Sequence, residues 1–167
     1  MIKCSYWLPV CRTLACPMKT IIQRVHSATV AVDNELIGQI GHGLMVLAGW
    51  APDDTESEHD WMASKLINMR IFPDENGQMN RSLLDIGGEI LVVSQFTLFA
   101  STKKGNRPGY SLAASPSDAL RLYDHFCLTL HKMLPNRVQT GKFGADMLIR
   151  LENYGPVTII VDTQNKI

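Results

Sequence analysis

The chain carries no excess of charge of either sign. Its 167 residues include 16 Lys and Arg and 16 Asp and Glu, so the formal net charge is zero. A protein without a global positive field does not attract nucleic acid by charge, so any contact with RNA must come from a local patch or from shape. Charge alone therefore favours a protein that does not touch RNA, and the length suits a single domain with a buried core.

Cysteine pairs and long apolar runs are also lacking. Of the four cysteines, three lie within the first sixteen residues and only Cys127 lies in the body of the chain. A body with one cysteine forms no internal disulfide, which fits a reducing cytoplasm, and Cys127 is typical of a small buried hydrophobe. No apolar run approaches the roughly 20 residues of a membrane-spanning helix, so we expect no membrane contact.

The short motifs of cofactor and metal sites are missing as well. The five histidines have no metal-ligand spacing, and there is no P-loop, dinucleotide-binding glycine motif or Ser–His–Asp set. We therefore expect neither a metal nor a cofactor. His125 and His131, on or near a predicted helix, are expected at its surface or edge.

Residues 1–17 differ from the rest of the chain. They show no helical or strand period, and Pro9, Cys11 and Arg12 interrupt the apolar stretch that a signal peptide requires. We expect a disordered or non-native extension there, followed by one domain over residues 18–167.

Strands make up most of the predicted elements. Alternating or continuous runs of apolar and β-branched residues predict them, and Asp33-Asn34-Glu35 is typical of a hairpin turn. The expected strands are 19–25, 28–32, 36–40, 44–49, 89–98, 145–152 and 157–162, the last two joined at Gly155-Pro156. The continuous apolar run 44–49 indicates a strand buried on both faces.

Two helices are predicted between these strands. The first covers 55–70 with Thr55 as its cap, and the second begins with Ser115 at the N-cap and Pro116 at the first helical position. The apolar residues of the second helix keep helical spacing: Leu120, Tyr123, Cys127, Leu130 and Leu134. Strand-rich ends around two helices favour an α+β domain with a curved, barrel-like sheet, mainly antiparallel or mixed.

The first candidate site is Ser94-Gln95-Phe96-Thr97, at the end of the most apolar strand. Catalytic groups often lie where a rigid strand opens into a loop, and backbone amides there can hold a carbonyl oxygen as it gains charge. The hydroxyls of Ser94 and Thr97 fit equally well as plain strand-end residues. A nucleophilic hydroxyl needs a base within reach, and no His or Lys neighbours Thr97 in the sequence.

The second candidate is the pair Gly155-Pro156. A Gly-Pro pair between two strands is usually only a turn, and Pro interrupts pairing because it has no N–H. A cis bond would point the two flanking carbonyls the same way, but cis bonds are rare, so the residues alone favour trans.

Two further segments have the composition of RNA contacts. Phe143 and Met147, near Lys142 and two glycines, suit a flat base and a phosphate, although core residues of a strand are the commoner explanation. The cations of the loop 103–108 suit phosphate binding, although such loops are more often merely solvated. Arg24 lies inside an apolar strand, which indicates a specific partner for its guanidinium.

Taken together, these segments resemble the D-aminoacyl-tRNA deacylase family from Met18 to about Thr163. One short motif would be weak, but several in the family's order are specific. They are Ile22-Gln23-Arg24-Val25, Arg70-Ile71-Phe72, Gly77-Gln78-Met79-Asn80, Val92-Val93-Ser94-Gln95-Phe96-Thr97-Leu98, Arg107-Pro108, Thr140-Gly141-Lys142-Phe143, Ala145-Asp146-Met147, and Asn153 with Gly155-Pro156-Val157-Thr158. Tyr154 departs from the family, where an acidic residue is common, and residues 1–17 have no counterpart in it.

The resemblance implies a cytoplasmic carboxylic ester hydrolase that releases a D-amino acid or glycine from tRNA and spares the L form. It implies a homodimer in which a cis Gly155-Pro156 pair, oriented by Arg24, enters the partner's pocket and excludes an L side chain. Phe143 and Met147 would hold the terminal adenine, the segment Ser94–Thr97 would line the ester, and the tRNA 2′-OH would assist hydrolysis. Neither DNA nor a membrane is expected as a partner.

Two other functions stay open. One is a hydrolase that uses Thr97 as its nucleophile. The other is a non-catalytic dimer that binds an RNA end or a nucleotide, which zero net charge disfavours.

Overall fold

The computed structural model describes residues 18–163. The expected extension over residues 1–17 lies outside the described residues. The elements, in chain order, are β1 (Lys19–Val32), β2 (Glu35–Ile40), β3 (Gly43–Gly49), α1 (Glu56–Asn68), β4 (Phe72–Pro73), β5 (Met79–Arg81), β6 (Glu89–Ser94), the 3-10 helix η1 (Phe96–Phe99), α2 (Pro116–Met133), β7 (Val138–Thr140) and β8 (Leu148–Asp162).

The main sheet is mixed, with the order β2-β1-β3-β6-β7 and with β8 on the other edge of β1. Strand β1 is antiparallel to β2, β3 and β8, whereas β6 is parallel to β3 and β7. The sheet curls until β2 approaches β7, so that a Cβ on Gly38 would lie 3.2 Å from the carbonyl oxygen of Thr140. The α+β class and the curved mixed sheet with two main helices are thereby confirmed.

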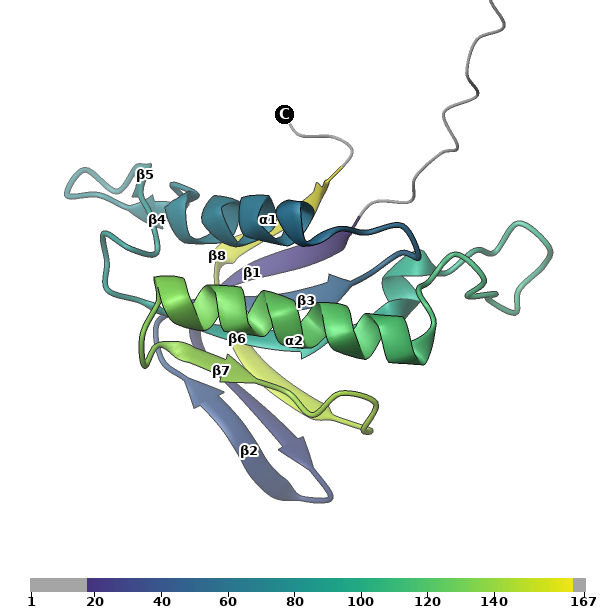
Figure 1. The fold of residues 1–167 in the computed structure, drawn as a ribbon. Coiled ribbons are helices and arrows are strands. Elements are labelled where there is room, and N and C mark those ends of the chain that lie inside the picture. Colours follow the sequence, from purple (N-terminus) through teal and green to yellow (C-terminus); the bar gives the residue numbers. More distant parts are fainter. Residues whose placement is uncertain (1–17, 164–167) are drawn as a thin grey trace, which may run out of the picture.

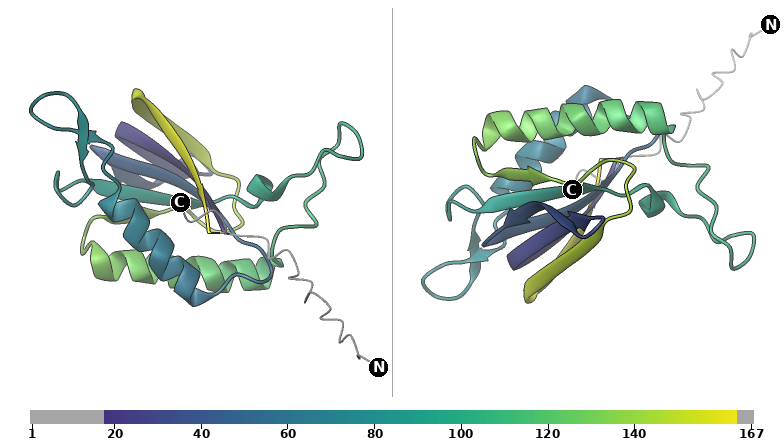
Figure 2. Two further views of the ribbon diagram at one scale, coloured as in Figure 1. Left: turned by 90° about the horizontal axis from the view of Figure 1, so that it is seen from above. Right: turned by 90° about the horizontal axis from the view of Figure 1, so that it is seen from below.

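Helices α1 and α2 lie side by side on one face of the sheet (Figures 1 and 2). The backbone amide of Thr55 donates to the Glu58 carboxylate at 2.8 Å, and Ser115 Oγ accepts from the amide of Asp118 at 3.2 Å, so both predicted caps are present. Leu120 is 42% exposed, so its place on the predicted apolar face is wrong: the buried stripe uses its neighbours Ala119 and Leu122 instead.

The core has two parts. One fills the space between the sheet and the helices, and the other fills the inside of the curl. Strand β3 separates them and is buried along nearly its whole length, as its continuous apolar run predicts. Cys127 is buried in the first part, where desolvation raises the pKa of its thiol to about 12, so it behaves as the expected small hydrophobe.

Strand β1 replaces the two strands predicted at 19–25 and 28–32. Its first half pairs with β3 and its second half with β2 along the same edge, while β8 pairs along the other edge. The polar residues His26 and Ser27 do not end the strand, because β8 continues to pair past them through an irregularity in register.

Two other predicted boundaries are wrong. Strand β6 ends at Ser94 rather than Leu98, because the chain turns into η1 after the last residue that pairs with β3. The strands predicted at 145–152 and 157–162 are one strand, β8, which resumes pairing with β1 beyond Gly155-Pro156.

Candidate active site

A cavity of about 550 Å³ lies at the end of the sheet where β3 and β6 stop. Its walls come from these strand ends, the loop between η1 and α2, the first turn of α2 and the turn between β7 and β8. Most of its side chains are apolar or aromatic, and its size lies within the roughly 300–1,000 Å³ of small-molecule sites. It is large enough for a nucleoside with a small group attached.

Three residues of the first candidate segment line this cavity: Ser94, Gln95 and Phe96. The amide of Gln95 donates to the carbonyl of Ala48 at 2.7 Å, which fixes the turn at the end of β6. Thr97 lies one position beyond the cavity wall, and its hydroxyl accepts from Gln95 Nε2 at 2.5 Å. The segment thus brings the Ser94 hydroxyl and the Gln95 side-chain amide to the wall, whereas the Thr97 hydroxyl is already bonded to Gln95.

Phe143 and Met147 also line the cavity, half-buried, on the turn that precedes β8. The expected strand from residue 145 is wrong here, because β8 begins only at Leu148. The hydroxyl of Tyr123 lies 3.2 Å from the carbonyl of Val92 and 3.1 Å from that of Gly141, and so ties this turn to β6.

Two aromatic residues of the wall were missed by the sequence analysis. Trp50 directly follows β3 and is 2% exposed, and its carbonyl accepts from the amide of Ala114 at 2.9 Å. Tyr110 packs edge-on against Phe96, with ring centroids 5.0 Å apart. The position of Trp50 immediately after a buried strand was the available signal, whereas Tyr110 sits in a loop without a pattern.

The Gly155-Pro156 pair lies outside this cavity. Gln23 pairs with Thr158 and Val25 with Asn153, so four residues of β8, 154–157, lie opposite Arg24 alone. They form an exposed bulge at Gly155 and Pro156 whose peptide bond is cis, as the resemblance implies. Gly155 has a φ of 132°, and a Cβ there would lie 2.8 Å from Arg24 Nη2, so glycine is required.

Arg24 has the specific partners that its place in the sequence predicts. It is 6% exposed, its Nε donates to the carbonyl of Tyr154 at 2.9 Å, and its Nη1 donates to the carbonyl of Ile71. Its guanidinium also lies 4.4 Å from the centroid of the Tyr154 ring. The ring of His42 lies 5.9 Å from that of Tyr154, and burial together with the charges of His26 and Arg24 lowers the pKa of His42.

The cavity and the bulge lie at opposite ends of the sheet. Arg24 pairs with Leu44 at the beginning of β3, whereas Ser94 pairs with Ala48 near its end. At about 3.3 Å per residue, the four residue steps from Leu44 to Ala48 separate them by about 13 Å along the strand. One chain therefore does not bring its own Gly155-Pro156 pair to its own cavity.

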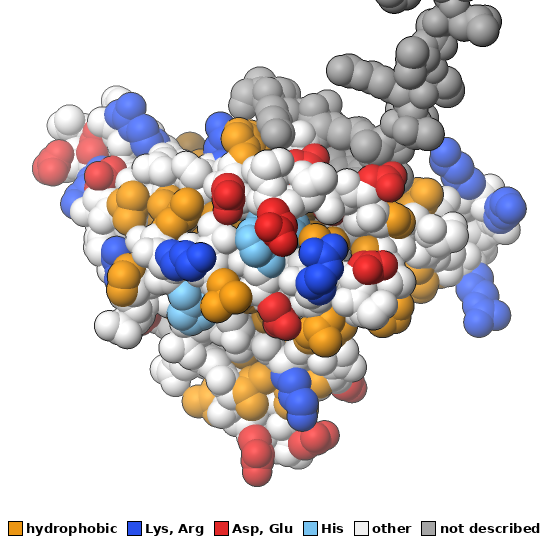
Figure 3. Space-filling view, in the orientation of Figure 1, with side chains coloured by type: hydrophobic (Ala, Val, Ile, Leu, Met, Phe, Trp, Pro, Cys, Tyr) orange, Lys and Arg blue, Asp and Glu red, His pale blue; other side chains and the backbone are white. Residues whose placement is uncertain are grey.

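The loop between η1 and α2 projects beyond the cavity, away from β4 and β5 (Figures 1 and 2). Figure 3 shows Lys and Arg side chains on this projection, where Lys103, Lys104 and Arg107 lie. Three cations of the chain thus lie on the loop that also contributes Tyr110, Ala113 and Ala114 to the cavity wall.

Among the described residues there is neither a cluster of metal ligands nor a helix that could span a membrane. Within residues 18–163, no three His, Cys, Asp or Glu side chains gather in a way that would hold a metal ion. Neither of the described helices is long and apolar enough to cross a bilayer.

A model of the D-Tyr-tRNA(Tyr) deacylase family matches residues 21–162. The chain belongs to this family. It is therefore an enzyme, a D-aminoacyl-tRNA deacylase of the hydrolase class, and the resemblance found in the sequence is confirmed.

Curated members of the family match nearly end to end. The D-aminoacyl-tRNA deacylase of Parabacteroides distasonis is 56% identical over 149 residues, which are 89% of this chain and 99% of that protein. That of Dechloromonas aromatica is 51% identical over 147 residues, covering 88% of this chain and 98% of its own.

Solved structures share the fold. The c-Myc DNA unwinding element binding protein superposes with a TM-score of 0.81 at 42% identity, over 86% of this chain and 97% of that one. A probable eukaryotic D-amino acid tRNA deacylase has a TM-score of 0.77 at 21% identity, over 88% of this chain and 100% of its own, and shows likeness of fold alone.

Proposed function

We propose that this deacylase cleaves the ester between a D-amino acid, or glycine, and the terminal adenosine of tRNA, and that it rejects the L ester. The cavity would take the adenosine, with Phe143 and Met147 beside the base and Ser94 and Gln95 beside the ester. The placement of a nucleoside-sized cavity at the end of a rigid strand supports this use. We expect the enzyme to work in the cytoplasm, as proofreading.

The selectivity would come from a second copy of the chain. The observation that carries this proposal is the separation, in one chain, of the cavity from an exposed bulge built around Gly155 and Pro156. In a homodimer, the bulge of one copy would enter the cavity of the other, where its main-chain carbonyls meet the substrate amino group. A rigid main chain next to the α-carbon leaves space for hydrogen but not for an L side chain.

Hydrolysis would depend on positioning rather than on a side-chain nucleophile. The Thr97 hydroxyl accepts from Gln95 Nε2 at 2.5 Å, which argues against its use as a nucleophile. In our proposal, the backbone amides of Phe96 and Thr97 hold the carbonyl oxygen of the ester as it becomes negative. The amides of Gln95, Leu98 and Ala100 already donate to other carbonyls, so they do not serve this role. The tRNA 2′-OH then helps water to add to the carbonyl, after which the bond to the 3′ oxygen breaks and this oxygen takes up the proton that the water gave up.

The first test compares the rates of release from D-Tyr-tRNA, L-Tyr-tRNA and Gly-tRNA. We expect turnover of the first and third and sparing of the second; equal hydrolysis of all three would contradict the filter. Thr97→Ala should retain turnover, whereas its loss would favour a Thr97 nucleophile. Binding of tRNA ends without any ester loss would instead indicate a non-catalytic binding protein.

The second test asks whether the site is shared between copies. In Gly155→Ala, the new Cβ meets Arg24 and Val157, so the bulge shifts and L-Tyr-tRNA hydrolysis should rise about hundredfold relative to the D substrate. Gly77→Ala is the matched control, because Gly77 also has a positive φ, of 76°, but nothing lies within 4 Å of the added atom. The control should keep full selectivity.

Mixing two variants then locates the bulge. Gln95→Ala should turn over slowly by itself, because the proposal places Gln95 beside the ester. An excess of this chain should place an intact bulge against nearly every Gly155→Ala cavity. Hydrolysis of L-Tyr-tRNA should then fall while that of D-Tyr-tRNA persists. If mixing changes neither rate, each site belongs to a single chain.

A further inference from the structure

Trp50 is the wall residue through which the cavity is connected to the helices. Its indole is 2% exposed and packs edge-on against Tyr123 and Phe126, with ring centroids 5.7 and 6.2 Å away. Tyr123 in turn lies 5.8 Å from Phe143, across the cavity wall. A displacement of Trp50 therefore disturbs an aromatic cluster of which two members, Trp50 and Phe143, line the cavity.

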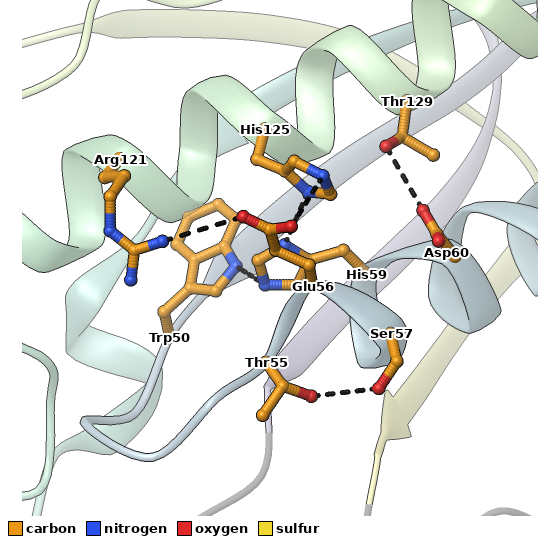
Figure 4. Close-up of polar contacts among 9 residues, drawn as sticks. All are labelled: Trp50, Thr55, Glu56, Ser57, His59, Asp60, Arg121, His125 and Thr129. Atoms are coloured by element: carbon orange, nitrogen blue, oxygen red, sulfur yellow. Dashed lines mark hydrogen bonds and ion pairs between the residues drawn. The ribbon is translucent and has the colours of Figure 1, made fainter.

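A buried histidine holds the indole of Trp50 in place (Figure 4). His59, on α1, is 0% exposed, and its Nε2 lies 3.1 Å from Trp50 Nε1. An indole N–H only donates, so His59 Nε2 must be the acceptor and must carry no proton. The ring proton of neutral His59 is therefore on Nδ1.

The same reasoning extends across to α2. His59 Nδ1 lies 3.3 Å from His125 Nδ1, and since the first carries the proton, the second must accept. The proton of His125 is then on Nε2, which lies 3.7 Å from the Glu56 carboxylate. Arg121 Nη1 lies 3.9 Å from the other oxygen of Glu56 at the surface. The indole donor of Trp50 thus fixes the tautomers of both His59 and His125, and the series of contacts ends at the surface with Glu56 and Arg121.

This series of hydrogen bonds forms only when both histidines are neutral. A proton added to His59 removes the acceptor of the Trp50 indole, and a proton added to His125 sets two N–H groups against each other. The His125 side chain is 30% exposed, so a proton can reach the pair from solvent.

The surroundings favour the neutral state of His59. The acidic residues of its own helix, Glu56, Glu58 and Asp60, act to raise its pKa, but burial outweighs them and His125 across the interface adds to its effect. The pKa of His59 is thereby lowered to about 4. The residue that faces His59 from the sheet side is Trp50, directly after β3, and it is uncharged.

We propose that Trp50, His59 and His125 form a positioning relay, in which protonation of His59 releases the indole, loosens the cavity wall and weakens substrate binding. His59 and His125 are positioning residues, since they act on the cavity through Trp50. This inference rests on the proposed use of the cavity as the substrate site.

The relay is tested first without substrate. The chain has three tryptophans, so Trp7→Phe with Trp61→Phe leaves Trp50 as the sole indole. Its emission should change in one step centred near pH 4 as the pH falls from 7.5 to 3, because a protonated imidazole beside an indole quenches it. His59→Gln keeps an acceptor that does not titrate, and should abolish the step. Emission without a step, or a step that survives His59→Gln, would overturn the relay.

The effect on the cavity is tested by kinetics with D-Tyr-tRNA. The KM of the enzyme should rise about twofold more than that of His59→Gln between pH 7.5 and pH 4, because half of a group is protonated at the pH that equals its pKa, with kcat changing alike in both. His59→Leu, which has no acceptor, should have the raised KM already at pH 7.5. A fluorescence step with no difference in KM would overturn the proposal. If no pH supports deacylation, the proposed function fails, whereas the fluorescence titration still decides the relay.

Discussion

The two ends of the sheet are supported by different chemistry. At the cavity end, the wall depends on aromatic packing and on neutral imidazoles, with His59 fully buried behind Trp50. At the opposite end, the bulge of β8 is held by Arg24, whose charge is permanent and whose donors reach two main-chain carbonyls. The cavity end is concave, and the bulge at the other end protrudes. These shapes fit our proposal that the two ends meet only between copies of the chain.

This difference separates the two ends experimentally. The neutral support fails when protons are added, whereas the Arg24 guanidinium offers only N–H donors and has no site that accepts a proton. Acid also reaches His42 beside the bulge, so the comparison of the enzyme with His59→Gln isolates the cavity end, and substitution of Arg24 isolates the bulge. Each of the following changes acts on one end and leaves the other as an internal control.

The largest effect is expected on stability in acid. The pKa of His59 is lowered from 6.5 to about 4, so below pH 6.5 the unfolded chain takes up a proton that the folded chain refuses. Stability therefore falls as the pH drops from 6.5 to about 4, by about 3 kcal/mol for a shift of this size. The measurement is the free energy of unfolding in denaturant near pH 7 and near pH 4, for the enzyme and for His59→Gln.

The decisive quantity is the difference between the enzyme and His59→Gln in how the free energy of unfolding depends on pH. Burial raises the pKa of Asp54 to about 7, although its carboxylate accepts from the amides of Met18 and Ala51. That group acts in the opposite sense, since folding favours its protonation between pH 7 and 3.8, but it is present in both proteins and cancels. Parallel stability curves for the enzyme and the variant would contradict the role given to His59.

A smaller effect is expected when Arg24 becomes Lys. A single ammonium does not reach the carbonyls of Tyr154 and Ile71 together, so the bulge loses one of its two fixed points. Hydrolysis of L-Tyr-tRNA relative to the D substrate should rise about tenfold, with an unchanged KM for D-Tyr-tRNA. Arg81→Lys is the control, because Arg81 also donates to a carbonyl, that of Asp85, but at the surface. A raised KM with unchanged selectivity would assign Arg24 to the cavity instead.

The sequence was most informative where structure is local. The caps at Thr55 and Ser115 and the apolar run of β3 each depend on neighbouring residues, and all three were predicted. Gly155-Pro156 was taken for a turn between strands, because nothing local tells whether the chain reverses or resumes its pairing with β1. That outcome depends on a partner strand more than a hundred residues away in the chain.

The cavity wall shows the same limit. Ser94, Gln95 and Phe96 could be found because they end an apolar strand, and Phe143 and Met147 because glycines surround them. The relay could not be found, since Trp50, His59 and His125 belong to three elements and no spacing relates them. Two histidines without metal-ligand spacing were set aside or expected at the surface, and only the packing of α1 on α2 brings them together.

The smallest effect is expected from the three cations of the loop between η1 and α2. Changing Lys103, Lys104 and Arg107 to Gln removes local charge that the neutral chain does not replace, so KM for D-Tyr-tRNA should rise about fivefold at moderate salt and depend less steeply on salt. The control variant replaces Lys65, Arg81 and Lys132, which changes net charge equally but away from the cavity. If both triple variants bind tRNA equally well, the loop does not contact the phosphates, and substrate recognition at the cavity end depends on the walls alone.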